Sequence, residues 1–222
     1  EASQADLTTR DLVALEVLAH WVRALSLEQL GVLLSPTSKD KSSAASRWLK
    51  RMAASGLVDE YTSTASEPQS MRVFYRCQLS SKESSSLVPD FRALSAQLRR
   101  RWMSHPKFTR VVRLGRAAAS MLGVPQPRRM RPSEASHDLQ LAAVALSLRD
   151  RGVVTSWEAE ESLARREVFK AVTPDALVTL DSGQQWVVEG GGSSYSAAKL
   201  EAFHRALLPQ LASAGLEGYL LV

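Results

Sequence analysis

Two acidic residues, Asp175 and Glu189, bracket a segment with the pattern of a β-hairpin in the last third of the chain. If the turn is centred on Ser182, antiparallel pairing places the two acids opposite each other, with Cβ atoms roughly 5 Å apart. Two carboxylates at that separation repel each other unless a proton or a cation lies between them. The spacing therefore predicts a site for a divalent metal, Mg²⁺ or Mn²⁺, and indicates no other cofactor.

The residue that would complete a hydrolytic site is displaced. A lysine beside such an acid pair orients or activates the attacking water and offsets the charge of a phosphate. The position two residues past the second acid is Gly191, which can do neither. Lys199 can reach the acids only if the next predicted helix begins over the strand ends. Asp175, Glu189 and Lys199 are thus the candidate catalytic residues, and an inactive site is the favoured interpretation.

The elements that would position these acids form an ordered series. The hydrophobic pattern predicts helix, strand, a charged segment of ambiguous structure, two strands, helix and strand, over 137–151, 153–157, 158–170, 176–180, 184–188, 197–211 and 218–222. The Gly-rich segment 190–192 before the second helix is either an anion-binding helix start or a flexible loop.

Three motifs add a resemblance to this order: HDL at 137–139, PDALVTL at 174–180 and WVVEGGGSSYSAAKLEAF at 186–203. Together they resemble the PD-(D/E)xK nuclease-like fold and, more closely, the replication-relaxation proteins of plasmids and integrated mobile elements. Members of that family look like a winged helix followed by a degenerate nuclease-like core. The family commonly lacks lysine two residues past the glutamate and has one in the following helix, as Gly191 and Lys199 do here.

The first 80 residues predict three helices followed by a two-stranded hairpin. A cap at Thr8 or Thr9 opens the first helix, and a capping box at Ser26 opens the second, over 27–34. The third helix spans 40–55, and strands are expected from Leu57 and over 71–79. This order resembles winged helix-turn-helix DNA-binding domains over about residues 7–79.

In such a domain the third helix enters the major groove of DNA. Its apolar stripe is Ala45, Trp48, Leu49 and Met52, and removing the stripe leaves a basic and polar side. That side suits contacts with phosphates and base edges, with Arg47 best placed for a guanine. The alternative is a solvated helix face, or a surface that binds protein. The predicted DNA-binding residues here are Lys39, Lys41, Ser42, Ser43, Ser46, Arg47 and Lys50, with Arg72 from the hairpin.

The net charge of +5 is concentrated in the middle of the chain. Residues 91–131 carry 11 basic and no acidic side chains, while the segments on either side are neutral or acidic. Such a field attracts polyanions, of which nucleic acid is the commonest in a cytoplasm. We expect one helix from Asp90 and another over 107–122, which track a phosphate backbone, pair in a homodimer, or do both. They add Arg99, Arg100, Arg110 and Arg113 to the DNA-binding candidates.

Composition excludes several classes of protein. No apolar run approaches the roughly 20 residues of a membrane-spanning helix, and the first residues, EASQADL, lack the pattern of a signal peptide. The single cysteine, Cys77, is expected in the core of a protein from a reducing cytoplasm. The four histidines are too scattered for a zinc site.

The sequence therefore predicts an α+β protein in three parts: a winged-helix DNA-binding domain over 1–80, a basic helical connector over 81–136, and a nuclease-like domain over 137–222. The expected function is duplex DNA binding in a mobile element, as a transcriptional regulator or as an accessory in replication or transfer. A Mg²⁺- or Mn²⁺-dependent endonuclease is the alternative from the enzyme class. A module that binds an acidic protein partner is the third.

Overall fold

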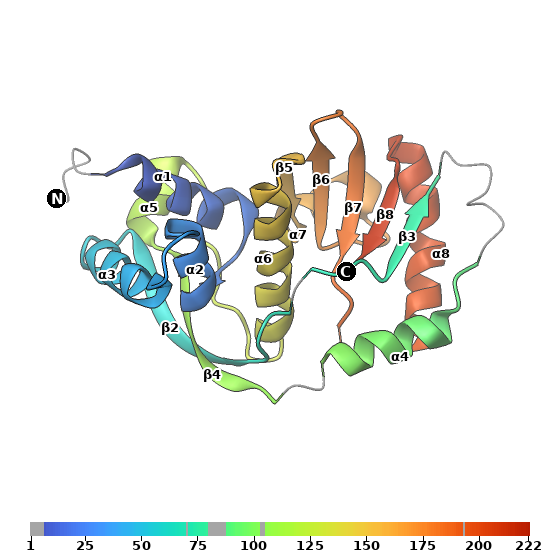
Figure 1. Ribbon diagram of the computed structural model, residues 1–222. Coiled ribbons are helices and arrows are strands. Elements are labelled where there is room, and N and C mark those ends of the chain that lie inside the picture. Colours follow the sequence, from blue (N-terminus) through green and yellow to red (C-terminus); the bar gives the residue numbers. More distant parts are fainter. Residues whose placement is uncertain (1–6, 70, 80–87, 103–104, 193) are drawn as a thin grey trace. The chain divides into compact units, whose positions relative to one another are not determined.

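A computed structural model describes residues 7–69, 71–79, 88–102, 105–192 and 194–222. The protein is α+β, and it divides into two compact units, each discontinuous in sequence (Figure 1). Unit 1 comprises Glu1–Pro68 and Pro106–Leu146, and unit 2 comprises Gln69–His105 and Ser147–Val222. This division differs from the three consecutive parts expected from the sequence, because the chain leaves unit 1 after Pro68 and returns to it at Pro106.

Unit 1 is built from helices around a three-stranded antiparallel sheet. The sheet order is β1-β4-β2, and β2 and β4 pair along all eight residues of each. Its elements are α1 (Thr9–Glu16), the π-helix η2 (Val17–Trp21), β1 (Leu25–Ser26), α2 (Leu27–Leu34), α3 (Lys41–Ala54), β2 (Val58–Ala65), β4 (Lys107–Leu114), α5 (Arg116–Leu122) and α6 (Ala135–Asp150), of which α6 continues into unit 2.

The predicted caps of unit 1 are confirmed. Thr8 caps α1 in a capping box with Asp11, and Ser26 caps α2 in a second box with Gln29. Each box satisfies backbone N–H groups that have no partner within the helix.

Two predictions about the sheet of unit 1 are wrong. The strand expected over 71–79 forms, as β3 (Tyr75–Gln78), but it pairs with β8 in unit 2 instead of with β2. The helix expected over 107–122 is a strand over its first half, because Lys107–Leu114 is rich in Val, Thr and Phe and completes the pairing of β2. The alternation within a segment indicates a strand but does not specify its partner, and arginines three residues apart occur in strands as well as in helices.

Unit 2 contains a five-stranded mixed sheet of order β3-β8-β7-β6-β5, in which β7 and β8 pair in parallel and the other neighbouring strands pair antiparallel. The order of elements from α6 onward is the one predicted. The charged segment that was ambiguous from sequence supplies two short helices. Besides β3, the elements are α4 (Phe91–Arg101), β5 (Val154–Ala159), α7 (Glu160–Leu163), η3 (Glu167–Phe169), β6 (Ala176–Leu180), β7 (Gln185–Glu189), α8 (Ala197–Ala214) and β8 (Gly218–Leu221).

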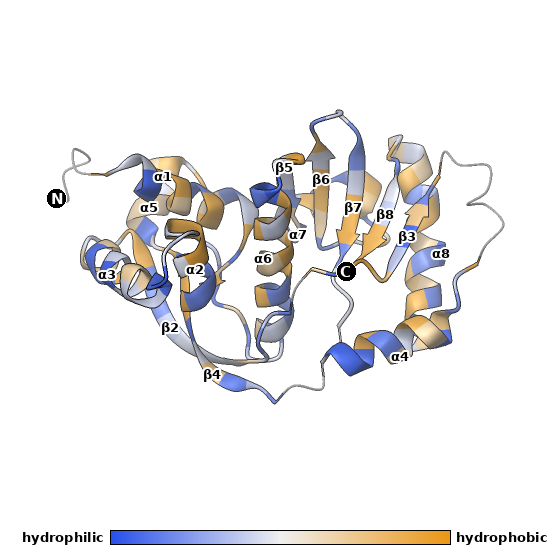
Figure 2. Ribbon diagram, in the orientation of Figure 1, coloured by the Kyte–Doolittle hydropathy of each residue, from blue (hydrophilic) through white to orange (hydrophobic). Residues whose placement is uncertain are grey.

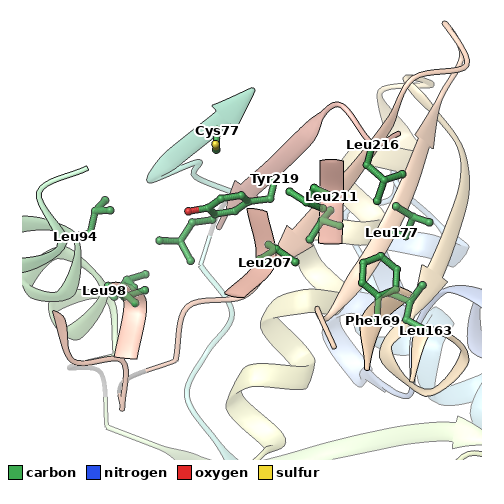
Figure 3. Packing of buried hydrophobic residues seen from close by; sticks show 13 residues of the cluster. Cys77, Leu94, Leu98, Leu163, Phe169, Leu177, Leu207, Leu211, Leu216 and Tyr219 are labelled. Atoms are coloured by element: carbon green, nitrogen blue, oxygen red, sulfur yellow. The ribbon is translucent and has the colours of Figure 1, made fainter. Parts of the chain in front are cut away.

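The core of unit 2 lies between one face of this sheet and its helices. Leu177 and Tyr219 of the sheet belong to one buried cluster with Leu207 of α8 and Leu98 of α4, and all four are at most 3 % exposed (Figure 3). Val187 of β7 belongs to the same cluster. Consecutive residues are buried in the two central strands, Ala176 to Val178 in β6 and Trp186 to Glu189 in β7, so side chains on both faces of these strands are covered. Figure 2 shows the hydropathy of the same strands. Cys77 is a buried member of the same cluster, as expected from the sequence, and burial raises the pKa of its thiol.

Candidate functional site

Helix α3 has the two sides that its sequence predicts. It begins after Asp40, whose side chain accepts a hydrogen bond of 3.1 Å from the backbone N–H of Ser43. The four residues of the apolar stripe are buried, none more than 5 % exposed. Arg47 and Lys50 are exposed on the opposite side, with Ser43 and Ser46 half-buried beside them. One face of the helix therefore presents cations and hydroxyls together.

The other predicted residues of this segment lie at the start of the same helix. Lys39 and Ser42 are exposed and Lys41 is half-buried. Seven of the twelve predicted DNA-binding residues are thus brought together on α3 and in the turn before it.

A buried carboxylate fixes the position of α3 against α1. Asp11 accepts hydrogen bonds from Trp48 Nε1 at 2.8 Å and from Arg51 Nη2 at 2.6 Å, both on α3. Its other carboxylate oxygen accepts the backbone N–H and the hydroxyl of Thr8, each at 2.8 Å. Asp11 is only 1 % exposed, so the two bonds from Thr8 hold the carboxylate in place and the two bonds from Trp48 and Arg51 orient α3 against α1.

The ionisation of Asp11 is part of this clamp. Burial alone would raise the pKa of Asp11, but the hydrogen bonds from Arg51 and Thr8 outweigh it and lower the pKa from 3.8 to about 2. The carboxylate therefore remains charged at neutral and mildly acidic pH.

Arg110 and Arg113 lie on the strand β4, whereas the sequence predicts a helix over 107–122. Arg110 Nε donates to Glu60 Oε1 at 2.5 Å, and Arg113 Nη2 donates to Asp59 Oδ2 at 2.7 Å. Arg113 also donates to the carbonyl of Pro127 and is largely buried. The acids that pair with these arginines come from β2, about 50 residues away in sequence. The positive charge around β4 is therefore smaller than the count of basic residues in 91–131 indicates.

The remaining three predicted DNA-binding residues belong to unit 2. Arg72 lies before β3 with its guanidinium 5.2 Å from the centre of the Phe74 ring, so it is not part of the sheet of unit 1. Arg99 and Arg100 are exposed in the last turn of α4, where cations complement the carbonyl end of a helix.

The acidic hairpin of unit 2 has the register that the sequence predicts. Ala176 pairs with Val188 and Leu177 with Val187, so the next positions outward are Asp175 and Glu189. Asp175 Oδ2 accepts the backbone N–H of Gly190 at 2.7 Å. Glu189 is 4 % exposed, whereas Asp175 is half-buried. Both acids lie on the face of the sheet that α8 covers, because each is two residues from a core residue of that face.

Tyr195 joins the acids to Lys199. Its hydroxyl donates a hydrogen bond to Glu189 Oε1, and the Lys199 ammonium lies 4.3 Å from the centre of its ring. Burial and the neighbouring Glu189 carboxylate raise the pKa of Tyr195, so the hydroxyl stays protonated and acts as a donor. The three predicted catalytic residues therefore occupy one region, with a tyrosine between the second acid and the lysine.

The position expected to hold lysine has no room for a side chain. A Cβ on Gly191 would lie 2.4 Å and 2.6 Å from the two methyl carbons of Leu98 on α4. Its backbone is held on both sides, because its N–H donates to the carbonyl of Val222 at 3.0 Å and its carbonyl accepts Trp102 Nε1 at 2.7 Å. A side chain at this position would therefore require the buried Leu98 side chain to shift.

The described residues fit a resident metal ion poorly. Within those ranges, no group of three or more His, Cys, Asp or Glu side chains is placed to hold a metal. Mg²⁺ can bind through one or two carboxylates and waters, but here Tyr195 donates to Glu189 and Gly190 donates to Asp175. A cation between the acids would compete with donors that the protein itself supplies.

Comparison with family models, with curated proteins and with solved structures found no match to this chain. In the part of the chain that the structure describes, no helix has both the length and the apolar character needed to cross a membrane.

Sequence reasoning gave no role to Asp11 or Tyr195. The only local signal at Asp11 is an acid in the first turn of a helix, and its partners Trp48 and Arg51 are about 40 residues away. Tyr195 lies in a segment of Gly and Ser before α8, and a single aromatic residue in such a loop is the signal that could have identified it.

Proposed function

We propose that the protein binds duplex DNA through α3 of unit 1. The observation that carries the proposal is the exposed face of α3, where Ser43, Arg47 and Lys50 lie together on a helix clamped from behind by Asp11. Arg47 suits a guanine edge, and Lys50 suits a phosphate. The order of elements around α3, with β2 and β4 as a paired ribbon, supports the winged helix-turn-helix interpretation.

Unit 2 is proposed to be a nuclease-like core of the PD-(D/E)xK type that no longer cuts. Its support is the acid pair in register together with the closed position at Gly191 and the hydroxyl of Tyr195 on the second acid. On this proposal the protein resembles the replication-relaxation proteins and acts in the cytoplasm as a homodimer. Its role is that of a transcriptional regulator or of an accessory in the replication or transfer of a mobile element.

The test is binding of fluorescent random-sequence duplexes, followed by selection of the preferred site and a salt titration. Replacing Arg47 and Lys50 by alanine should weaken specific binding by about 10-fold or more and reduce the salt slope by about two phosphate equivalents. The matched control is Lys170→Ala with Arg205→Ala, which removes two exposed cations from unit 2. Equal affinity of the two double variants would reject α3 as the DNA-binding element.

An endonuclease remains the second candidate, because Asp175 and Glu189 face each other and Lys199 lies within the same region. Incubation of supercoiled plasmid with Mn²⁺ and either the wild type or Asp175→Ala tests it. Nicking by the wild type alone would establish the activity, and no metal-dependent nicking by either would reject it.

A further inference from the structure

An open pocket of about 830 Å³ lies among helices α1, α2 and α3 of unit 1. Among the residues that the structure describes, the charged lining consists of Arg10, Arg47, Arg51 and one acid, Asp11. Thr8, Thr9 and Ser35 contribute hydroxyl groups to the same lining. Three guanidinium groups against one carboxylate give this cavity a positive balance.

The acid is placed where a ligand cannot reach it. Asp11 is 1 % exposed, and its oxygens are already occupied by Thr8, Trp48 and Arg51. Arg51 uses one nitrogen for Asp11 and its side chain is 48 % exposed, so its remaining N–H groups are available. The Asp11 carboxylate is therefore buried, and its hydrogen bond orients the more exposed guanidinium group of Arg51.

The other two guanidinium groups have no hydrogen bond or ion pair within the residues that the structure describes. Arg10 and Arg47 are both exposed, on α1 and α3 respectively. Arg10 lies in the first turn of α1, next to Thr9, where helix N–H groups point outward and the helix dipole favours an anion. Cations on two helices and a helix start thus line the same cavity.

Guanidinium groups bind phosphate in a two-pronged geometry, and a cavity of this size accommodates a small phosphorylated molecule. We propose that this pocket is a phosphate-binding site, separate from the base-reading face of α3 and sharing only Arg47 with it. This inference deepens the proposed function, because a phosphate that engages Arg47 in the pocket withdraws it from DNA. The phosphate belongs either to a small molecule or to the DNA backbone.

Titration calorimetry with inorganic pyrophosphate, at constant ionic strength set with NaCl, tests the pocket without DNA. Arg10→Ala should weaken pyrophosphate binding roughly 10- to 100-fold, because a charge-assisted pair is removed. Arg116→Ala, which removes an exposed cation from α5 of the same unit, should leave it unchanged. Pyrophosphate should also lower the DNA affinity of the wild type more than that of Arg10→Ala.

The outcomes separate the two phosphate sources and the two proposals. If pyrophosphate does not bind but Arg10→Ala weakens DNA binding and lowers the salt slope by about one, the pocket receives a backbone phosphate. If pyrophosphate binds in the pocket but the wild type fails to bind DNA, the pocket stands and the proposed function fails. No pyrophosphate binding, together with unchanged DNA affinity of Arg10→Ala, would overturn the inference.

Discussion

Placing a side chain at Gly191 should destabilise the protein, even though lysine at this position would restore the nuclease motif. The Cβ of Gly191→Ala would lie 2.4 Å from one methyl carbon of Leu98, 2.6 Å from the other and 3.0 Å from its Cγ. Leu98 is fully buried, and the backbone of Gly191 is held by hydrogen bonds to Val222 and Trp102, so neither side can withdraw.

The magnitude follows from overpacking. Inserting a methyl group into a well-packed core costs about 1–3 kcal/mol, so Gly191→Ala should lose that much free energy of unfolding. Gly191→Lys should cost more, because its longer side chain needs more space than a methyl group at the same closely packed position, and it should not create plasmid-nicking activity. Urea unfolding monitored by tryptophan fluorescence measures the loss.

A neighbouring glycine supplies the control. A Cβ on Gly192 would lie 3.6 Å from Tyr195, an ordinary contact, so Gly192→Ala should change the stability by less than about 0.5 kcal/mol. Leu98→Ala alone should cost about 2–5 kcal/mol, but combined with Gly191→Ala it should cost less than the sum of the two. Stability of Gly191→Ala within 0.5 kcal/mol of the wild type, or additivity in the double variant, would refute the packing argument.

Three further predictions concern groups that support the two candidate sites. Because hydrogen bonds lower the pKa of Asp11 from 3.8 to about 2, its stabilisation of about 2 kcal/mol is present above pH 4 and is lost as the pH falls toward 2. Asp11→Asn should abolish that part of the acid dependence in urea midpoints measured between pH 2 and 5; an unchanged profile would exclude the clamp as its source. Tyr195→Phe should cost about 1.5–3 kcal/mol, because Glu189 loses a charge-assisted hydrogen bond in a buried site, and a loss below 0.5 kcal/mol would contradict this. Gly31→Ala should lower the thermal midpoint, since its Cβ would lie 2.8 Å from a backbone oxygen at the start of α3, and a midpoint equal to that of the wild type would show that the helices can separate.

The parts of the fold that depend on nearby residues followed from the sequence. The capping boxes at Thr8 and Ser26, the buried stripe of α3 and the register of the acidic hairpin each involve residues within about 14 positions of one another. In such segments the periodicity of apolar residues and the turn chemistry determine the structure together.

Contacts between residues that are far apart in the sequence could not be predicted from it. The arginines of β4 are neutralised by Asp59 and Glu60, and the Asp11 clamp joins residues about 40 positions apart. A charge count along the chain cannot detect such pairs, because the partners are brought together only by the sheet and by helix packing. Within the segment 81–136, for which a basic helical connector was expected, arginines lie both on a strand of unit 1 and on a helix of unit 2.

The segment between β2 and β4 belongs to unit 2, and it explains both the wrong partner predicted for the strand at 71–79 and the absence of a lysine at position 191. Residues 69–105 separate the paired strands of unit 1, which is why the returning strand was sought too early, at 71–79. The same residues add β3 to the edge of the sheet in unit 2 and place Leu98 and Trp102 against Gly191. The segment that interrupts the ribbon of unit 1 therefore also fills the space that a lysine beside the acid pair would need. On this argument, Gly191→Lys alone cannot restore the motif, because α4 would first have to move away from the end of β7.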